Sequence, residues 1–207
     1  MSISVCLDSI YLDSVYYGCM IELMILGFLA EGPLHGYELR KKMDQLMGYA
    51  RPISYGTIYP AIHRLTDKGL LTERTVPGSG VTQRKMLTLT DAGRERLEQM
   101  LREADGLTIT DLNHFNVVLS FLSELPDEEE RRAVLRRRLD FLEQPASFFY
   151  QGDRPIQSKA ISDPYRRGVF VSAAAFRNAQ IEWLHSMLDD GKPSDASAAS
   201  DETEADA

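Results

Sequence analysis

The pattern of apolar and polar positions near the start of the chain predicts three successive helices. Apolar residues recur at helical spacing in residues 21–30, in residues 37–47 and after Ser54, where the third run ends at Gly69. Glycine and proline separate the three runs, and such residues end helices or form turns. Ser54 is a favourable N-cap for the third helix. Pro60 inside that helix forfeits one backbone hydrogen bond, so a kink is expected there.

Two runs of strand-forming residues follow the third helix and predict a β-hairpin. They cover residues 70–76 and 81–89, and the turn-forming residues 77–80 join them. Thr90 is a favourable N-cap for a fourth helix, whose apolar face ends at Leu101. The order helix, helix, helix, hairpin, helix is that of a winged helix-turn-helix domain, so the fold class is mainly α with a small β-hairpin wing. In such a domain one helix fits the major groove of DNA and the preceding helix crosses the backbone.

The second half of the chain is predicted to be helical. Residues 111–125 form one helix, and Pro126 occupies the first position of the next. In that next helix an acidic run precedes five arginines, so we interpret these charges as a solvated helix face rather than a nucleic-acid patch. A mixed loop at 145–163 precedes a long helix at 164–190. This last helix carries a heptad-like seam, suited to packing against a helix of the same chain or of a second one, at Val169, Ala173, Phe176, Gln180, Trp183 and Met187.

Acidic and basic residues are distributed unevenly along the chain, so the net charge alone does not describe its surface. With 23 Lys and Arg against 31 Asp and Glu, the formal net charge of the 207 residues is −8, which by itself argues against a nucleic-acid partner. Residues 48–88, however, hold six basic residues against two acidic ones, while residues 193–207 hold five acidic residues and no basic one. The basic segment covers the third helix and the hairpin, and it is compatible with phosphate binding or with an ordinary solvated surface.

The two ends of the chain differ from the segments between them. Residues 1–19 contain Asp8 and Asp13 but no basic residue, so they do not resemble a secretory signal, and we expect an extension upstream of a natural start at Met20. No apolar run reaches the length of a membrane span, and we predict a cytoplasmic protein without a membrane partner. The predicted organisation is an N-terminal extension at 1–19, a winged domain at 20–104, a helical domain at 105–190 and a disordered acidic tail at 191–207.

The sequence contains no clear catalytic or metal-binding motif. There is no nucleophile elbow, no phosphate-binding loop and no pair of carboxylates at a useful spacing, so we predict that the protein is not an enzyme and needs no cofactor. Cys6 and Cys19 lack neighbouring ligands, and His35 and His63 are interpreted as structural or surface groups, so no metal site is predicted. A helical adaptor that binds only protein and a metal sensor are the alternative classes.

Several motifs closely resemble those of the PadR family of bacterial transcriptional regulators. They stand in the family's order and spacing at residues 22–39, 54–62, 64–65, 68–70 and 89–93. The C-terminal helices resemble, more loosely, a longer subfamily with a virulence-activator-like domain. The resemblance implies that residues 105–190 form a dimerisation domain and that a homodimer binds a palindromic DNA operator, usually as a repressor of a neighbouring gene. It also implies that a proline belongs inside the recognition helix, where this chain has Pro60. Many members of the family are released from DNA by a small-molecule effector, so the resemblance implies such an effector here. An activator built on the same domain is the alternative.

The winged fold indicates which residues meet DNA. Base contacts specify sequence and phosphate contacts fix the register, so we assign the start of the third helix to bases and the hairpin with nearby basic residues to phosphates. The predicted base-reading residues are Ser54, Tyr55, Thr57, Ile58 and Tyr59, and the predicted phosphate-binding residues are Tyr37, Arg64, Arg84 and Lys85. The structural alternatives are core packing for Ile58, Tyr59 and Tyr37, and helix capping for Ser54 and Thr57. An effector pocket, or alternatively a dimer core, is hypothesised at Phe148, Phe149, Phe176 and Trp183.

Overall fold

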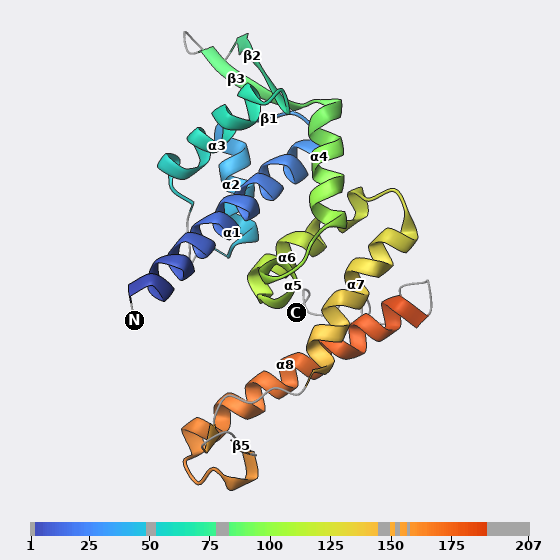
Figure 1. The fold of residues 1–207 in the computed structure, drawn as a ribbon. Coiled ribbons are helices and arrows are strands. Elements are labelled where there is room, and N and C mark those ends of the chain that lie inside the picture. Colours follow the sequence, from blue (N-terminus) through green and yellow to red (C-terminus); the bar gives the residue numbers. More distant parts are fainter. Residues whose placement is uncertain are drawn as a thin grey trace, which may run out of the picture. The chain divides into compact units, whose positions relative to one another are not determined.

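The computed structural model describes residues 3–48, 53–77, 83–144, 150–151, 154–156 and 158–189. The chain forms two compact units, residues 1–134 and residues 135–207, and the division falls within helix α7 (Glu128–Glu143). The first unit contains α1 (Ile3–Ala30), β1 (Leu34–His35), α2 (Gly36–Leu46), α3 (Tyr55–Asp67), β2 (Leu71–Pro77), β3 (Gln83–Leu89), α4 (Asp91–Arg102), α5 (Leu107–Thr110), α6 (Leu112–Ser120), the 3-10 helix η1 (Leu122–Glu124) and the start of α7 (Figure 1). The second contains the rest of α7, β4 (Tyr150–Gln151), β5 (Arg154–Pro155), the 3-10 helix η2 (Ser158–Ala160) and α8 (Pro164–Asp189).

The ends of the first helices follow the local rules that the sequence indicates. Thr90 precedes α4, and its hydroxyl oxygen accepts a hydrogen bond from the N–H of Gly93 over 3.0 Å, which confirms the predicted N-cap. Gly48 and Gly69 follow α2 and α3 with φ of +64° and +72°, a left-handed conformation that glycine adopts without strain. Helix α3 continues through Pro60.

A three-stranded antiparallel sheet in the order β1-β3-β2 builds the wing and ties it to the start of α2. β2 pairs with β3 over seven residue pairs, which confirms the predicted hairpin. β1 comprises only Leu34 and His35, which lie opposite Leu87 and Met86 of β3. The sequence does not predict β1, because two residues are too few to establish an alternating pattern.

Helix α1 lies at the centre of the first unit. Ile25 and Leu26 are fully buried, and α1 contacts α2, α3, α4, α5 and α6. Gly27 allows α1 to approach the Phe121 ring closely, since an added Cβ would lie 2.5 Å from that ring. Elements after residue 104 therefore belong to the same core, and the first compact unit extends beyond the domain boundary predicted at that residue.

Helix α1 is longer than the apolar run that predicts it. It begins at Ile3, so the residues predicted as an N-terminal extension are helical from that point, and residues 21–30 form only its C-terminal part. Tyr17 is 41% exposed, whereas Met20 is buried, which marks where the helix enters the core. In the part of the chain that the structure describes, no helix has the length and hydropathy needed to cross a membrane.

The helix predicted at 111–125 is shorter than expected. Helix α6 ends at Ser120, and Phe121 leaves helical geometry with φ of −115° before η1 begins. The ring of Phe121 packs edge-on against Phe28 of α1 with 5.0 Å between the ring centroids. Packing against α1 accompanies the break in the helix, and the apolar spacing of the sequence does not reveal it.

Helix α7 begins two residues later than predicted. Pro126 is not its first residue, because Asp127 acts as the cap: its Oδ1 accepts the N–H of Glu129 over 2.7 Å. Arg132 lies 4.0 Å from Glu128 and 3.6 Å from Glu129. For this arginine, the interpretation of the charged run as a paired helix face therefore agrees with the structure.

The second unit holds α7 and α8 together through polar and apolar contacts. Arg138 donates a hydrogen bond from Nη2 to the Gln180 Oε1 over 2.8 Å, and Leu184 is fully buried. Helix α8 matches the predicted range 164–190 within one residue. The loop predicted at 145–163 is more ordered than expected, since its described residues include the β4–β5 hairpin and η2.

Candidate nucleic-acid interface

Helices α2 and α3 form the helix-turn-helix, and α3 has a buried face and an exposed face. Ile58, Ala61, Ile62 and Leu65 recur at helical spacing and are at most 2% exposed. The structure therefore corrects one predicted base contact. The Ile58 side chain has 0% exposure, so it packs in the core and does not reach the surface where a base edge would lie.

The exposed face of α3 carries two stacked tyrosines. Tyr55 and Tyr59 are 49% and 41% exposed, and their rings lie 5.8 Å apart between centroids with an interplanar angle of 11°. Ser54 stands at the N-cap position, but its hydroxyl lies 2.9 Å from the Thr57 hydroxyl and caps no backbone N–H. The start of α3 therefore presents hydroxyl groups and phenol rings, which can form hydrogen bonds and also contact the methyl group of thymine.

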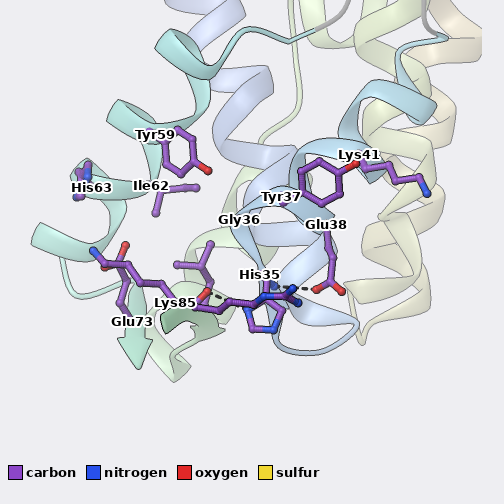
Figure 2. A pocket seen from close by; sticks show the side chains of 12 residues that line it. His35, Gly36, Tyr37, Glu38, Lys41, Tyr59, Ile62, His63, Glu73 and Lys85 are labelled. Atoms are coloured by element: carbon purple, nitrogen blue, oxygen red, sulfur yellow. Dashed lines mark hydrogen bonds and ion pairs between the residues drawn. The ribbon is translucent and has the colours of Figure 1, made fainter. Parts of the chain in front are cut away.

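A groove with a volume of about 800 Å³ lies between α3, the sheet and the start of α2. Its lining comes from elements that are far apart in the sequence, as Figure 2 shows. The lining residues are Tyr37, Glu38 and Lys41 of α2 with Gly36 at its start, Tyr59, Ile62 and His63 of α3, His35 of β1, Glu73 of β2, and Arg84, Lys85 and Leu87 of β3.

Both basic and acidic side chains face this groove. The Lys85 Nζ lies 2.7 Å from the Glu73 Oε2, with side chains that are 62% and 20% exposed. An ion pair with so exposed a partner contributes only about 0–1 kcal/mol to stability, so a DNA phosphate can compete with Glu73 for the Lys85 ammonium group. The Glu38 carboxylate accepts the backbone N–H of His35 over 3.0 Å and so caps the start of α2. Lys41 is exposed on α2.

His35 joins the wing to α2. Its Nδ1 lies 3.1 Å from the carbonyl oxygen of Lys85, which can only accept, so Nδ1 carries the hydrogen. Gly36 follows, and a Cβ at that position would lie 3.4 Å from the ring of Tyr59. His35 is thus a structural group and His63 is exposed, as interpreted from the sequence. Among the described residues, no three side chains of metal-binding type gather at one point.

The structure brings part of the predicted interface together. Four of the nine predicted DNA-contacting residues line the groove, namely Tyr37, Tyr59, Arg84 and Lys85. Arg64 is exposed in the last turn of α3 and is not part of the lining. Sequence reasoning missed Glu73 and Lys41. Lys41 stands one helical turn after Tyr37, and this spacing is the signal that identifies it.

The residues of the hypothesised effector pocket are only partly described. Phe148 and Phe149 lie outside the described residues, while Phe176 and Trp183 are 51% and 38% exposed on α8. Seven positions separate these two aromatic residues, so they lie on the same side of the helix. An exposed apolar side of this kind suits a partner helix as well as a ligand.

The chain is similar to known transcriptional regulators. The sequence model of the Transcriptional regulator PadR-like family matches residues 25–99. The chain is 31% identical over 110 residues to Negative transcriptional regulator PadR of Bacillus subtilis, an alignment that covers 53% of this chain and 60% of that protein. It is 35% identical over 89 residues to Transcriptional regulator Rv3488 of Mycobacterium tuberculosis, covering 42% of this chain and 78% of that protein. A crystal structure of Bacillus subtilis PadR in complex with operator DNA has a TM-score of 0.40 and 25% identity, covering 81% of this chain and 95% of that chain.

The helix-turn-helix, the wing and the groove between them define a winged-helix protein of the DNA-binding class. The chain belongs to the PadR-like family of transcriptional regulators. It spans 60% of the length of its Bacillus subtilis relative. The named relatives are regulators rather than enzymes, which agrees with the prediction of a non-enzymatic role.

Proposed function

We propose that this protein is a homodimeric transcriptional repressor that binds a palindromic DNA operator in the cytoplasm. The observation that carries the proposal is the groove between α3, the start of α2 and the wing, because it gathers basic and aromatic side chains beside an exposed recognition helix. The Bacillus subtilis relative is named a negative transcriptional regulator, which supports repression as the direction of control.

In the proposed complex, α3 lies in the major groove of the DNA. Its exposed tyrosines and the hydroxyl groups at its start then face base edges, while the wing follows the sugar-phosphate backbone. The phosphate-binding groups in this arrangement surround the groove and extend along α3. They are Tyr37, Lys41, Arg64, Arg84 and Lys85.

The proposed dimer uses the exposed apolar side of α8. Val169, Phe176 and Trp183 follow one another at intervals of seven residues and are 45%, 51% and 38% exposed. A stripe with this spacing is typical of a helix that packs against another helix. Two winged domains in one dimer then reach half-sites about one helical turn, or 10–10.5 bp, apart. A small-molecule effector would release the DNA by favouring a dimer geometry that does not match this spacing.

Replacing both Arg84 and Lys85 by alanine is expected to weaken the salt dependence of DNA binding. Each phosphate contact releases condensed counterions, so the slope of log K against log salt concentration should become shallower by about 0.9 for each contact that is lost. The measurement is fluorescence anisotropy between about 50 and 200 mM salt. The probe is a duplex that the wild-type protein selects from a random-sequence library.

Arg102→Ala is the matched control for this double variant. Arg102 lies in the last turn of α4, at the opposite end of that helix from the sheet, and pairs with Glu130 over 2.6 Å. The salt slope of the Arg102→Ala variant should therefore equal that of the wild type. An unchanged slope for the double variant would show that the wing does not contact phosphates. If the wild-type protein binds no DNA at low salt, the adaptor that binds only protein becomes the better explanation.

Replacing Glu73 by glutamine is expected to raise the affinity for DNA about fivefold, which corresponds to about 1 kcal/mol. The substitution removes a negative charge from the groove and releases Lys85 from its ion pair for contact with a phosphate. Competition binding at fixed salt measures the change. Glu95→Gln, which alters the same charge on the exposed surface of α4, should have little effect. A weaker affinity for the Glu73 variant would mean that the ion pair holds Lys85 in its binding position.

A further inference from the structure

Helix α2 holds one backbone position in the turn of the helix-turn-helix from both sides. The N–H of Ile53 donates to the Asp44 Oδ1 over 2.7 Å, and the carbonyl oxygen of Ile53 accepts from the Arg40 Nε over 2.9 Å. Arg40 and Asp44 stand one turn apart on α2, with 3.4 Å between the Arg40 Nη2 and the Asp44 Oδ2. We call Arg40 and Asp44 the clamp. Because the Ile53 side chain is only 1% exposed, the clamped residue is also anchored in the core.

The clamp continues onto the exposed face of α3. The Arg40 guanidinium carbon lies 4.1 Å from the centroid of the Tyr55 ring, which is a cation–π distance. Tyr55 in turn stacks on Tyr59 with 5.8 Å between the ring centroids. One arginine therefore holds the backbone just before α3 and also supports the row of rings that α3 presents. A rotation of α3 about its own axis would break one of these contacts.

The same contacts distinguish Arg40 from the basic residues that face solvent. The side chains of Arg40 and Asp44 are 23% and 14% exposed, and the guanidinium is directed at the Ile53 carbonyl, the Asp44 carboxylate and the Tyr55 ring. Lys41, the next residue along α2, is exposed and lines the groove. Counterions leave the DNA where a protein cation neutralises a phosphate, and Arg40, unlike the 62% exposed Lys85, is mostly buried beside its carboxylate, so it should contribute little to this release.

We infer that Arg40 and Asp44 are positioning residues that set the orientation of α3, and with it the base sequence that the protein selects, without contacting DNA. The inference rests on the proposed function. Without the clamp, Tyr55 and Tyr59 lose their defined orientation, so contacts to base edges become less specific. The phosphate contacts from the wing and from Lys41 persist. The defect therefore appears in discrimination between sequences rather than in general affinity.

The central test compares Arg40→Met with Lys41→Met, which alter neighbouring residues of one helix. The probes are a duplex that the wild-type protein selects from a random-sequence library and a scrambled duplex of the same composition, each titrated between about 50 and 200 mM salt. For Arg40→Met, affinity for the selected duplex should fall about tenfold or more, while affinity for the scrambled duplex and the salt slope stay unchanged. For Lys41→Met, both affinities should fall equally, and the slope should become shallower by about 0.9 for each lost contact.

Two variants of Asp44 separate geometry from charge. In Asp44→Asn the amide oxygen still accepts the Ile53 N–H, so selectivity should stay close to that of the wild type. Asp44→Ala should lose selectivity as Arg40→Met does. Hydrogen exchange at the Ile53 amide gives a readout that does not depend on DNA, and only Asp44→Ala should accelerate it strongly. Thermal unfolding of each variant verifies that the first unit remains folded.

Three results would overturn the inference. A shallower salt slope with equal loss on both duplexes in Arg40→Met would identify Arg40 as a phosphate contact. Unchanged selectivity in Arg40→Met and Asp44→Ala, together with faster exchange at Ile53, would limit the clamp to a structural role. A wild-type protein that selects no duplex from the random-sequence library would remove the proposed function and the selective role together, whereas either of the first two results leaves the proposed function intact.

Discussion

Replacing Gly93 by alanine is expected to destabilise the first unit by about 3 kcal/mol, the upper part of the range for overpacked sites. A Cβ at this position would lie 2.2 Å from the carbonyl oxygen of Leu70 and 2.6 Å from the Leu89 Cδ1. The Leu70 oxygen cannot easily move away, because the Thr90 N–H donates to it over 3.1 Å, and the Thr90 hydroxyl, whose single hydrogen is shared between the Gly69 and Leu70 carbonyl oxygens, lies 3.0 Å from it. The added methyl group thus meets fixed backbone rather than a flexible side chain.

Thermal unfolding followed by circular dichroism measures this effect. About 3 kcal/mol corresponds to a fall in the melting temperature of roughly 6–12 °C for a chain of this size. Gly168→Ala in α8 is the matched control, since a Cβ there would meet nothing within 4 Å, and helix propensity predicts a neutral or slightly stabilising change. A melting temperature for Gly93→Ala equal to that of the control would show that α4 moves away from Leu70 at little cost.

Replacing Phe176 by glutamate is expected to dissociate the proposed dimer. Phe176 is 51% exposed and lies midway along the stripe between Val169 and Trp183. A carboxylate in the middle of an apolar helix interface loses its hydration without gaining a partner, which costs several kcal/mol. The dimer dissociation constant should therefore rise at least about a hundredfold, the equivalent of about 2.7 kcal/mol. Light scattering at micromolar concentration should then give the mass of one 23.3 kDa chain instead of two.

Ala174→Glu is the control for the dimer prediction. Ala174 is exposed and lies two positions from Phe176, on the opposite side of α8, so the same added charge should leave the dimer intact. Affinity for a two-half-site duplex should fall only in the Phe176 variant, because one winged domain alone loses the second half-site. A wild-type protein that scatters as a single chain, or a Phe176 variant that stays dimeric, would exclude this side of α8 as the interface.

Local signals were sufficient for the order of helices and for the wing. Thr90 and Gly69 mark helix ends through interactions that involve only neighbouring residues, so their roles follow from the sequence. The prediction that Ile58 contacts a base was wrong, although a local signal was present there too. Its spacing to Leu65 already indicates the buried face of α3, but the expectation that base contacts cluster at the start of the helix took precedence over this periodicity. Tyr59, one position later, is exposed because one residue rotates the side chain by about 100°.

By itself, the sequence determined the succession of helices, the hairpin, the long final helix and the basic segment within an acidic chain. Only the tertiary structure decided which side chains act together. The groove depends on contacts such as that between His35 and Lys85, which are 50 positions apart, and the clamp depends on Arg40 reaching Ile53 across the turn. Helical periodicity and capping act over three or four residues and cannot specify such pairs. These distant residues are brought together by the packing of α1 against the other helices of the first unit and by the pairing of β1 with β3.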